Sequence, residues 1–169
     1  SDLKKFNKYK SVILIGMGGS SLGAKAIYSF CKDKIKKKFI FFDNLDQLKI
    51  AKIKKNFISE NSLFILISKS GNTLETLINS NLFKDKINNK NTIIITEKKT
   101  NMLNIFARKK NILLIDHKDY IGGRFSVLSE VGMIPSYFMG LKVNSFRKNL
   151  FKFFKFKQKK SILENVIKL

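Results

Sequence analysis

Short apolar runs alternate along this chain with stretches of helical periodicity, and this alternation limits the fold more than any other feature. The runs are rich in β-branched and aromatic residues, which favour strands. They are continuous rather than alternating, as expected of strands buried on both faces of a sheet. This pattern is typical of a parallel sheet with crossover helices. The expected strands are residues 12–15, 39–42, 63–67, 92–95 and 112–115.

The segments between the expected strands carry apolar residues three or four positions apart, which is the spacing of one helix face. We expect each of these stripes to cover the sheet. The stripes are Leu22, Ala26 and Phe30, then Leu74, Leu77, Ile78 and Leu82, then Met102, Ile105 and Phe106.

The pattern changes after the fifth expected strand. A loop covers residues 116–120, and a helix is expected from about Ser129, with Pro135 in its first turn or bending it. The predicted fold class is α/β: a doubly wound, three-layer sandwich built on a five-stranded parallel sheet, followed by C-terminal helices. In such sheets ligands bind outside the carboxyl ends of the strands, so functional residues are sought in the loops that follow strands.

The net charge of +22 comes from 34 basic residues against 12 acidic ones, and only Arg108, Arg124 and Arg147 among the basic residues are arginines. Lysine shares A/T-rich codons with the abundant Asn, Ile and Phe, so a drift in genome composition explains the basicity at least as well as a polyanionic partner. We therefore expect neither a nucleic acid nor a membrane as partner. A lone cysteine, Cys31, excludes a disulfide framework and indicates the reducing cytoplasm. No apolar run reaches the ~18 residues that a membrane span needs.

The first expected strand runs into a glycine-rich loop, residues 16–23, and then into a helix. Glycine lets backbone N–H groups approach an anion, and the amino end of the helix adds a favourable dipole. A dinucleotide site is one interpretation, because Asp43 ends the second strand near the position of a ribose-binding acid. Ser21 stands, however, where the third glycine of that motif belongs. By itself this loop predicts either an anion site or a tight turn.

The third expected strand runs into a loop with three side-chain hydroxyl groups, one ammonium group and the start of a helix. These donors match the needs of a phosphate dianion, whose oxygens accept several charge-assisted hydrogen bonds. An alternative is that Asn72 and Glu75 form a capping box and that the hydroxyls bond only to the loop backbone. No Walker motif is present, which argues against a nucleoside triphosphate. The predicted phosphate-binding residues are Ser68, Lys69, Ser70, Gly71, Asn72 and Thr73.

Two glycines and an arginine, Gly122, Gly123 and Arg124, follow the fifth expected strand. The glycines allow backbone to approach a ligand closely, and Arg124 supplies a permanent cation. Such a cation can stabilise an oxyanion that forms during a reaction. The alternative is a structural ion pair of Arg124 with Asp119 or Glu130.

Together the three loops resemble those of the phosphoglucose isomerase family, whose first half is a sugar isomerase (SIS) domain. Residues 16–23 read G-M-G-G-S-S-L-G against the family's G-x-G-G-S-x-L-G, and residues 68–76 read S-K-S-G-N-T-L-E-T against S-K-[ST]-x-x-T-x-E-[TP]. Residues 122–126 read G-G-R-F-S against G-G-R-[FY]-S. Each motif is weak alone, but three in this order, each after an expected strand, are specific. The resemblance covers residues 11–141.

The resemblance implies interconversion of glucose 6-phosphate and fructose 6-phosphate through a cis-enediol, in glycolysis and gluconeogenesis, without a metal or an organic cofactor. Residues 68–73 would hold the phosphate, while Gly19 and Ser20 would line the sugar. Gly123 and Arg124 would face the reacting carbons, with Arg124 as the catalytic residue that stabilises the enediolate. The resemblance also implies a cytoplasmic enzyme with a second SIS domain and a partner subunit in a homodimer.

The resemblance divides the chain into an SIS domain, residues 1–141, and a helical extension, residues 142–169, that leads toward a second domain. In the family the proton-transferring Glu, the His of ring opening and a C-terminal Lys lie downstream of this region. We assign no catalytic role to Glu75 or His117. The chain alone is expected to bind phosphosugar with negligible isomerase turnover.

Two other interpretations stay open. A free-standing SIS module that senses a phosphosugar would bind its ligand without catalysis and would not require the G-G-R-F-S element. An NAD-binding domain would bind its cofactor at residues 16–21 and would leave residues 68–73 without a purpose. The three motifs together favour the isomerase.

Overall fold

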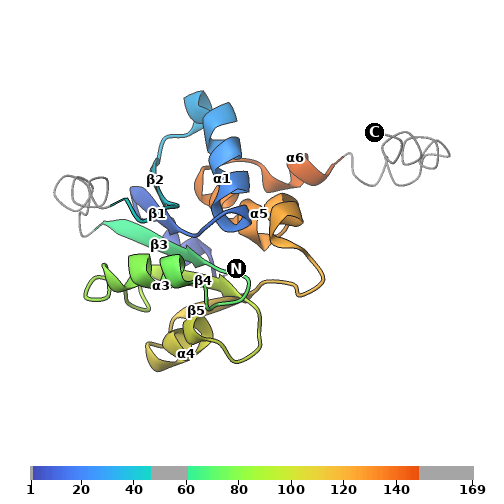
Figure 1. The fold of residues 1–169 in the computed structure, drawn as a ribbon. Helices are drawn as coiled ribbons and strands as arrows, with labels where there is room; N and C mark the ends of the chain where they lie inside the picture. The colour runs from blue at the N-terminus through green and yellow to red at the C-terminus, as the bar shows by residue number, and fades with distance from the viewer. Residues whose placement is uncertain (1, 47–60, 149–169) are drawn as a thin grey trace, which may run out of the picture.

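A five-stranded parallel sheet forms the centre of the molecule in a computed structural model that describes residues 2–46 and 61–148 (Figure 1). The strand order is β2-β1-β3-β4-β5, and every neighbouring pair is parallel. This confirms the predicted α/β fold class. Each expected strand is present within one residue at either end: β1 (Ser11–Ile15), β2 (Lys38–Phe42), β3 (Ser62–Ile67), β4 (Thr92–Thr96) and β5 (Leu113–Asp116).

Helices cover both faces of the sheet. On one face α1 (Gly19–Phe30) and α5 (Glu130–Phe138) pack over one set of strand side chains, and on the other face α3 (Leu74–Asn81) and α4 (Met102–Lys109) pack over the alternate set (Figure 1). Every residue of β3 is buried. The continuous apolar runs in the sequence reflect this two-sided burial, because no strand position in the middle of the sheet faces water.

The predicted apolar stripe of α1 is wrong. Leu22 is 59% exposed and Phe30 is 92% exposed, whereas Ala24 faces the core. The buried face of α1 carries small residues because other elements approach it closely: a Cβ on Gly23 would lie 2.8 Å from a methyl carbon of Val127. Ile27 and Tyr28, which lie outside the predicted stripe, pack against the core instead.

The predicted stripes of α3 and α4 are also out of phase with the core. Leu74 and Met102 are more than half exposed, and Leu103 and Ala107 provide the buried face of α4. Only part of each stripe contacts the core beneath these helices, namely Leu77, Leu82 and Phe106. The positions of α3 that are buried are polar: Thr76, Asn79 and Ser80.

The expected helix after the fifth strand is present as α5. Its amino end is capped by Ser129, whose side-chain oxygen accepts a hydrogen bond from the Val131 N–H. Pro135 lies inside the helix rather than in its first turn. A short helix, α6 (Val143–Arg147), begins the predicted extension, and residues 149–169 lie outside the described residues.

The direction in which strands are added to the sheet reverses between β1 and β3. Strand β2 lies on one side of β1, whereas β3, β4 and β5 follow on the other side. Helices α1 and α3 leave these two strands toward opposite faces of the sheet. Such a switch point opens a crevice at the carboxyl ends of the two strands, where ligands bind in this fold class. The two loops that carry the first two motifs flank this crevice.

Among the helices that the structure describes, none has the length and apolar composition that a membrane-spanning helix needs.

Candidate functional site

The loop after β3 is held by a network of its own hydroxyl groups. The Ser68 and Thr73 hydroxyl oxygens lie 2.8 Å apart, and those of Ser70 and Thr73 lie 3.4 Å apart. Backbone N–H groups donate back to this network, from Gly71 to Ser68 at 3.1 Å and from Asn72 to Ser70 at 3.2 Å. Ser68 is buried, whereas Ser70 is exposed. The sequence-predicted hydroxyls therefore do converge, with Ser68 shaping the loop from beneath.

The amino end of α3 has no side-chain cap. Thr73 occupies the N-cap position in an extended conformation, and its hydroxyl accepts no bond from the first turn. The predicted alternative, a capping box of Asn72 and Glu75, is wrong, because the Asn72 side-chain oxygen accepts instead from the Met102 N–H of α4 at 2.9 Å. The first-turn N–H groups of α3 are left to bind an external acceptor, and the helix dipole favours an anion there.

Gly71 is required at its position by both conformation and space. Its φ of +67° lies in the left-handed region, and a Cβ would lie 1.9 Å from the side-chain oxygen of Asn101. Asn101 is buried and caps α4 by accepting from the Asn104 N–H, while its amide donates to the Thr96 hydroxyl and to two carbonyls. Sequence reasoning missed Asn101, although an Asn directly before an apolar helical pattern is an N-cap signal.

Lys69 points along the sheet edge toward β4 and β5. Its ammonium donates to the Asp119 carbonyl at 2.6 Å and lies 3.7 Å from a carboxylate oxygen of Glu97. The Lys69 side chain thus ties the loop after β3 to the loop after β5. Its predicted contact with phosphate requires the ammonium to turn from these partners or to share them.

The third motif lies against the first. It forms η3 (Gly123–Leu128), which packs on α1 near Gly19. A Cβ on Gly19 would lie 2.3 Å from the carbonyl carbon of Gly123, so only glycine allows the two backbones to approach this closely. The Ser126 hydroxyl donates to the Gly123 carbonyl at 2.6 Å and reaches the Gly19 carbonyl at 3.4 Å. Residues over a hundred positions apart are therefore joined at one point.

Arg124 is exposed and forms no ion pair or hydrogen bond with any residue in the described ranges. The alternative prediction of a structural ion pair with Asp119 or Glu130 is wrong. Asp119 instead accepts from the Tyr120 N–H through its side chain. The Arg124 guanidinium remains available for an anionic ligand.

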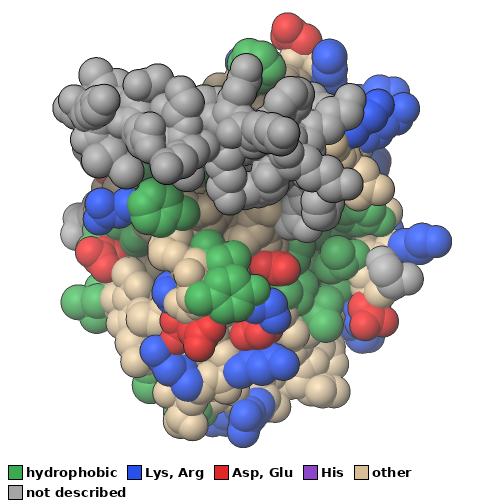
Figure 2. All heavy atoms as spheres, turned by 90° about the vertical axis from the view of Figure 1, so that its right-hand side faces the viewer, with side chains coloured by type: hydrophobic (Ala, Val, Ile, Leu, Met, Phe, Trp, Pro, Cys, Tyr) green, Lys and Arg blue, Asp and Glu red, His purple; other side chains and the backbone are tan. Residues whose placement is uncertain are grey.

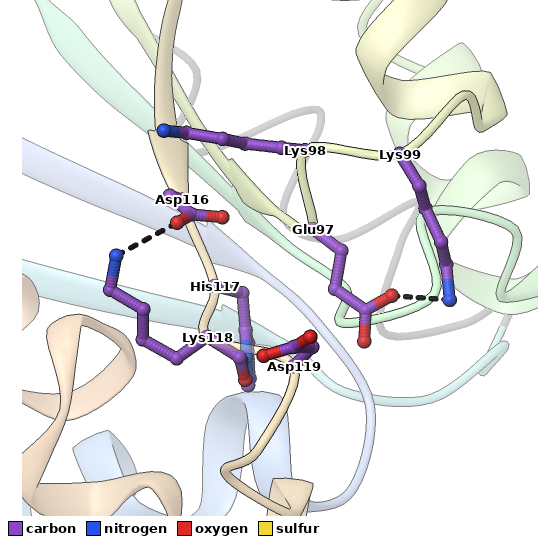
Figure 3. Close-up of a pocket in the computed structure, with 7 residues that line it drawn as sticks. All are labelled: Glu97, Lys98, Lys99, Asp116, His117, Lys118 and Asp119. Atoms are coloured by element: carbon purple, nitrogen blue, oxygen red, sulfur yellow. Dashed lines mark hydrogen bonds and ion pairs between the residues drawn. The ribbon is translucent and has the colours of Figure 1, made fainter.

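A hollow of about 550 Å³ opens near the loop after β3, at the carboxyl ends of β4 and β5 (Figure 3). Ion pairs of Lys118 with Asp116 and of Lys99 with Glu97 hold its walls. The hydrogen bond from Lys118 lowers the pKa of Asp116 below its ordinary value, and the same bond raises the pKa of Lys118. His117 is buried at its base, with Nδ1 3.1 Å from the Lys118 carbonyl oxygen.

The face that contains these loops carries charges of both signs. Figure 2 shows acidic and basic side chains there, next to exposed hydrophobic ones. Tyr120 in the loop after β5 and Phe125 in η3 are both largely exposed. Asp43, the candidate ribose-binding acid of the dinucleotide interpretation, pairs at 2.5 Å with Lys25 of α1. That pairing occupies the carboxylate that a ribose would need.

Comparison with known proteins places these loops in a family. The family model described as phosphoglucose isomerase matches residues 3–151. Among curated proteins, the glucose-6-phosphate isomerase of Methanocaldococcus jannaschii is 36% identical over 167 residues, which cover 96% of this chain and 41% of that protein. The chain thus spans less than half the length of this relative.

Solved structures agree with this assignment. A hypothetical protein from Thermus thermophilus matches with a TM-score of 0.81 and 25% identity, over 89% of this chain and 39% of that one. A glucose-6-phosphate isomerase from Chlamydia trachomatis matches with a TM-score of 0.70 and 29% identity, over 81% of this chain and 28% of that one. The chain described here belongs to the phosphoglucose isomerase family.

Proposed function

We propose that this chain provides the phosphosugar-binding SIS domain of a glucose-6-phosphate isomerase. The observation that carries the proposal is the loop after β3, where Ser70 and Thr73 present hydroxyl groups beside the uncapped amino end of α3. A phosphate monoester needs several donors at one point, and hydroxyls, amide N–H groups and a helix dipole provide them together. Ser68 positions Thr73 from below, and Gly71 lets the loop turn without a side chain in the way.

The sugar would extend from this loop across the switch point. Gly19 and Ser20 would line it on the side of β1, and Gly123 would lie next to them, since Gly19 and Gly123 are in contact. The Arg124 guanidinium, which has no partner among the described residues, would face the reacting carbons. A proton moves between C2 and C1 in this isomerisation, and the charge on the intermediate enediolate oxygen is the charge that Arg124 would stabilise.

The contacts with the phosphate group would lie far from the reacting carbons of the substrate. Their binding energy would orient the substrate so that these carbons face the catalytic groups. No group of this chain is assigned the proton transfer. We propose that the catalytic Glu, His and Lys lie downstream, in and beyond a second SIS domain. We also propose that the enzyme is a cytoplasmic homodimer. The 169-residue chain alone would bind phosphosugar with negligible turnover.

Thermal unfolding with and without ligand tests the proposal, because a ligand that binds only the folded state raises its melting temperature. Glucose 6-phosphate should stabilise the chain, and glucose at the same concentration should not. Thr73→Val, which removes one hydroxyl of the loop, should reduce the stabilisation, whereas Ser29→Ala on the exposed side of α1 should preserve it. Equal stabilisation by glucose, or an unaffected Thr73→Val variant, would remove the phosphate site from the account.

A further inference from the structure

Within residues 2–46 and 61–148, the basic residues are not spread evenly over the surface. The amino edge is defined here as the edge of the sheet where strands begin, formed by residues 4–10, 32–37, 84–90 and 108–110. More than half of residues 4–10 and 32–37 are lysines, and residues 108–110 are all basic. Asp33 and Asp85 are the acidic residues in these four segments.

Contacts between the four segments make the amino edge one continuous surface. The Lys37 ammonium donates to the Asn7 carbonyl at 2.8 Å, and the Tyr9 hydroxyl donates to the Lys90 carbonyl at 2.9 Å. The Lys110 ammonium donates to the Lys84 carbonyl at 3.1 Å. The residues before β1 and three helix-to-strand connections therefore lie side by side.

Three of the four segments of the amino edge carry basic side chains that no described acid neutralises. In residues 4–10, 32–37 and 108–110, no lysine or arginine forms an ion pair with a residue that the structure describes. The opposite edge behaves differently: Glu97 and Asp116, at the ends of β4 and β5, pair with nearby lysines. Acidic and basic side chains are mixed on that side of the molecule (Figure 2).

Genome composition does not account for this asymmetry. A drift toward A/T-rich codons raises the number of lysines but has no preference for one edge of a sheet. Helix dipoles favour cations at helix carboxyl ends, which explains Arg108 and Lys109 in the last turn of α4. They do not explain Lys8 and Lys10, which directly follow a three-residue 3₁₀ helix, η1 (Lys4–Phe6). Uncompensated like charges in one place repel each other, and a polyanion would relieve that repulsion.

The geometry points to the amino edge as a binding surface for single-stranded nucleic acid. Lysines from the four segments would contact successive phosphates of one strand. Phe30, at the carboxyl end of α1 beside this edge, is 92% exposed and supplies a flat apolar face on which a base can stack. This reverses the expectation from composition alone, because the position of the charges, rather than their number, carries the inference.

A lipid surface fits the amino edge less well. Membrane-surface binding needs several apolar side chains that enter the headgroup region beside the basic ones. Of the large hydrophobic side chains that the structure describes as exposed, Phe30 lies by the amino edge. The others lie in the first turn of α1, on α3, on α4, in η3 or in the loops after β2 and β5: Leu22, Leu74, Ile78, Met102, Ile105, Phe125, Leu45 and Tyr120. The amino edge therefore has the positive charge needed to contact phosphates but too few apolar side chains to insert into a lipid headgroup region.

Fluorescence anisotropy with a labelled oligouridine of about 20 nucleotides tests the inference on the full 169-residue chain, at an ionic strength of about 0.1 M. Binding should weaken steeply as salt increases. The double variant Lys34→Glu/Lys36→Glu should weaken binding by at least about tenfold. The matched control Lys98→Glu/Lys99→Glu changes the net charge by the same amount at the opposite edge and should leave affinity within about twofold.

Phe30→Ala should weaken oligouridine binding by about fivefold or more, and Phe125→Ala, which removes an exposed ring at the other edge, should not. Circular dichroism should show that all variants remain folded. Equal losses in the two double variants would mean that net charge alone attracts the strand and would overturn the proposal. Co-sedimentation with phosphatidylserine vesicles in the absence of oligouridine binding would also overturn it, and would assign the edge to a lipid surface.

Discussion

Gly19 and Gly123 meet backbone to backbone: a Cβ on the first would lie 2.3 Å from the carbonyl carbon of the second. This contact joins the loop after β1 to the loop after β5, and it forms because Gly19 has no side chain to separate the two backbones. The sugar-lining and arginine-bearing motifs are thus parts of one structure. Their relative position depends on a single close approach.

Gly19→Ala should therefore destabilise the chain. The added methyl group meets backbone atoms that cannot rotate away, and overpacking of this kind costs about 1–3 kcal/mol of the free energy of unfolding. Gly123→Ala is the matched control, because a Cβ there meets nothing within 4 Å. Its free energy of unfolding should change by less than about 1 kcal/mol. Urea denaturation measures both, and equal effects would show that the contact is not tight.

Gly71→Ala should lower the free energy of unfolding by more than the positive φ of Gly71 alone would cost. Gly71 and Gly140 both have positive φ, which costs an alanine about 1–2 kcal/mol. A Cβ on Gly140 finds open space, whereas a Cβ on Gly71 meets the buried Asn101 side chain. In urea denaturation, the loss in free energy of unfolding caused by Gly71→Ala should exceed that caused by Gly140→Ala by at least about 1 kcal/mol. A smaller difference would mean that Asn101 can move without cost.

The Asp116 and Lys118 pair should make stability depend on pH in a defined direction. Lys118 lowers the pKa of Asp116, so the pair stabilises the fold above the ordinary carboxyl pKa and loses that effect as pH falls through the lowered value. The raised pKa of Lys118 means that the pair also fails at the alkaline end, as pH rises through the pKa of Lys118 in the folded state.

Lys118→Met should accordingly lower the melting temperature at neutral pH, and the difference from the parent chain should shrink as pH falls below about 4. Lys109→Met is a suitable control, since Lys109 forms no ion pair with a described residue. Differential scanning calorimetry from neutral to acid pH provides the comparison. A constant difference at all pH values would contradict the ion-pair explanation.

The variant Arg124→Ala distinguishes two roles for the Arg124 guanidinium, contact with a ligand or support of the fold. Because Arg124 has no partner among the described residues, the free energy of unfolding should change by less than about 0.5 kcal/mol. In a complete enzyme that carries this domain, turnover should fall by about 10²–10³-fold, as for the loss of one oxyanion donor. A large fall in melting temperature with turnover preserved would reverse this assignment.

The strands and the site loops could be predicted from the sequence because both are local properties. Residues 63–67 form an apolar run with no break, and a run of that kind has few places in a fold other than a covered strand. The Ser and Thr side chains of the loop after β3 are close in sequence, so their convergence at the start of a helix follows from the strand–loop–helix order alone.

The helix faces and the long-range contacts could not be predicted in the same way. Phe30 has the spacing of a core residue and is nevertheless exposed, because the buried side of α1 is set by the close approach of η3 rather than by apolar periodicity. The contacts of Gly19 with Gly123 and of Gly71 with Asn101 join distant segments of chain. Only the assembled sheet brings such segments together.

Amide chemical-shift perturbation by glucose 6-phosphate is the decisive test of phosphate binding at the loop after β3, because it reports on that loop residue by residue. The amides of residues 70–76 should shift strongly with glucose 6-phosphate and should not shift with unphosphorylated glucose. Shifts of equal size with both sugars, or an unchanged set of amides at the start of α3, would contradict it.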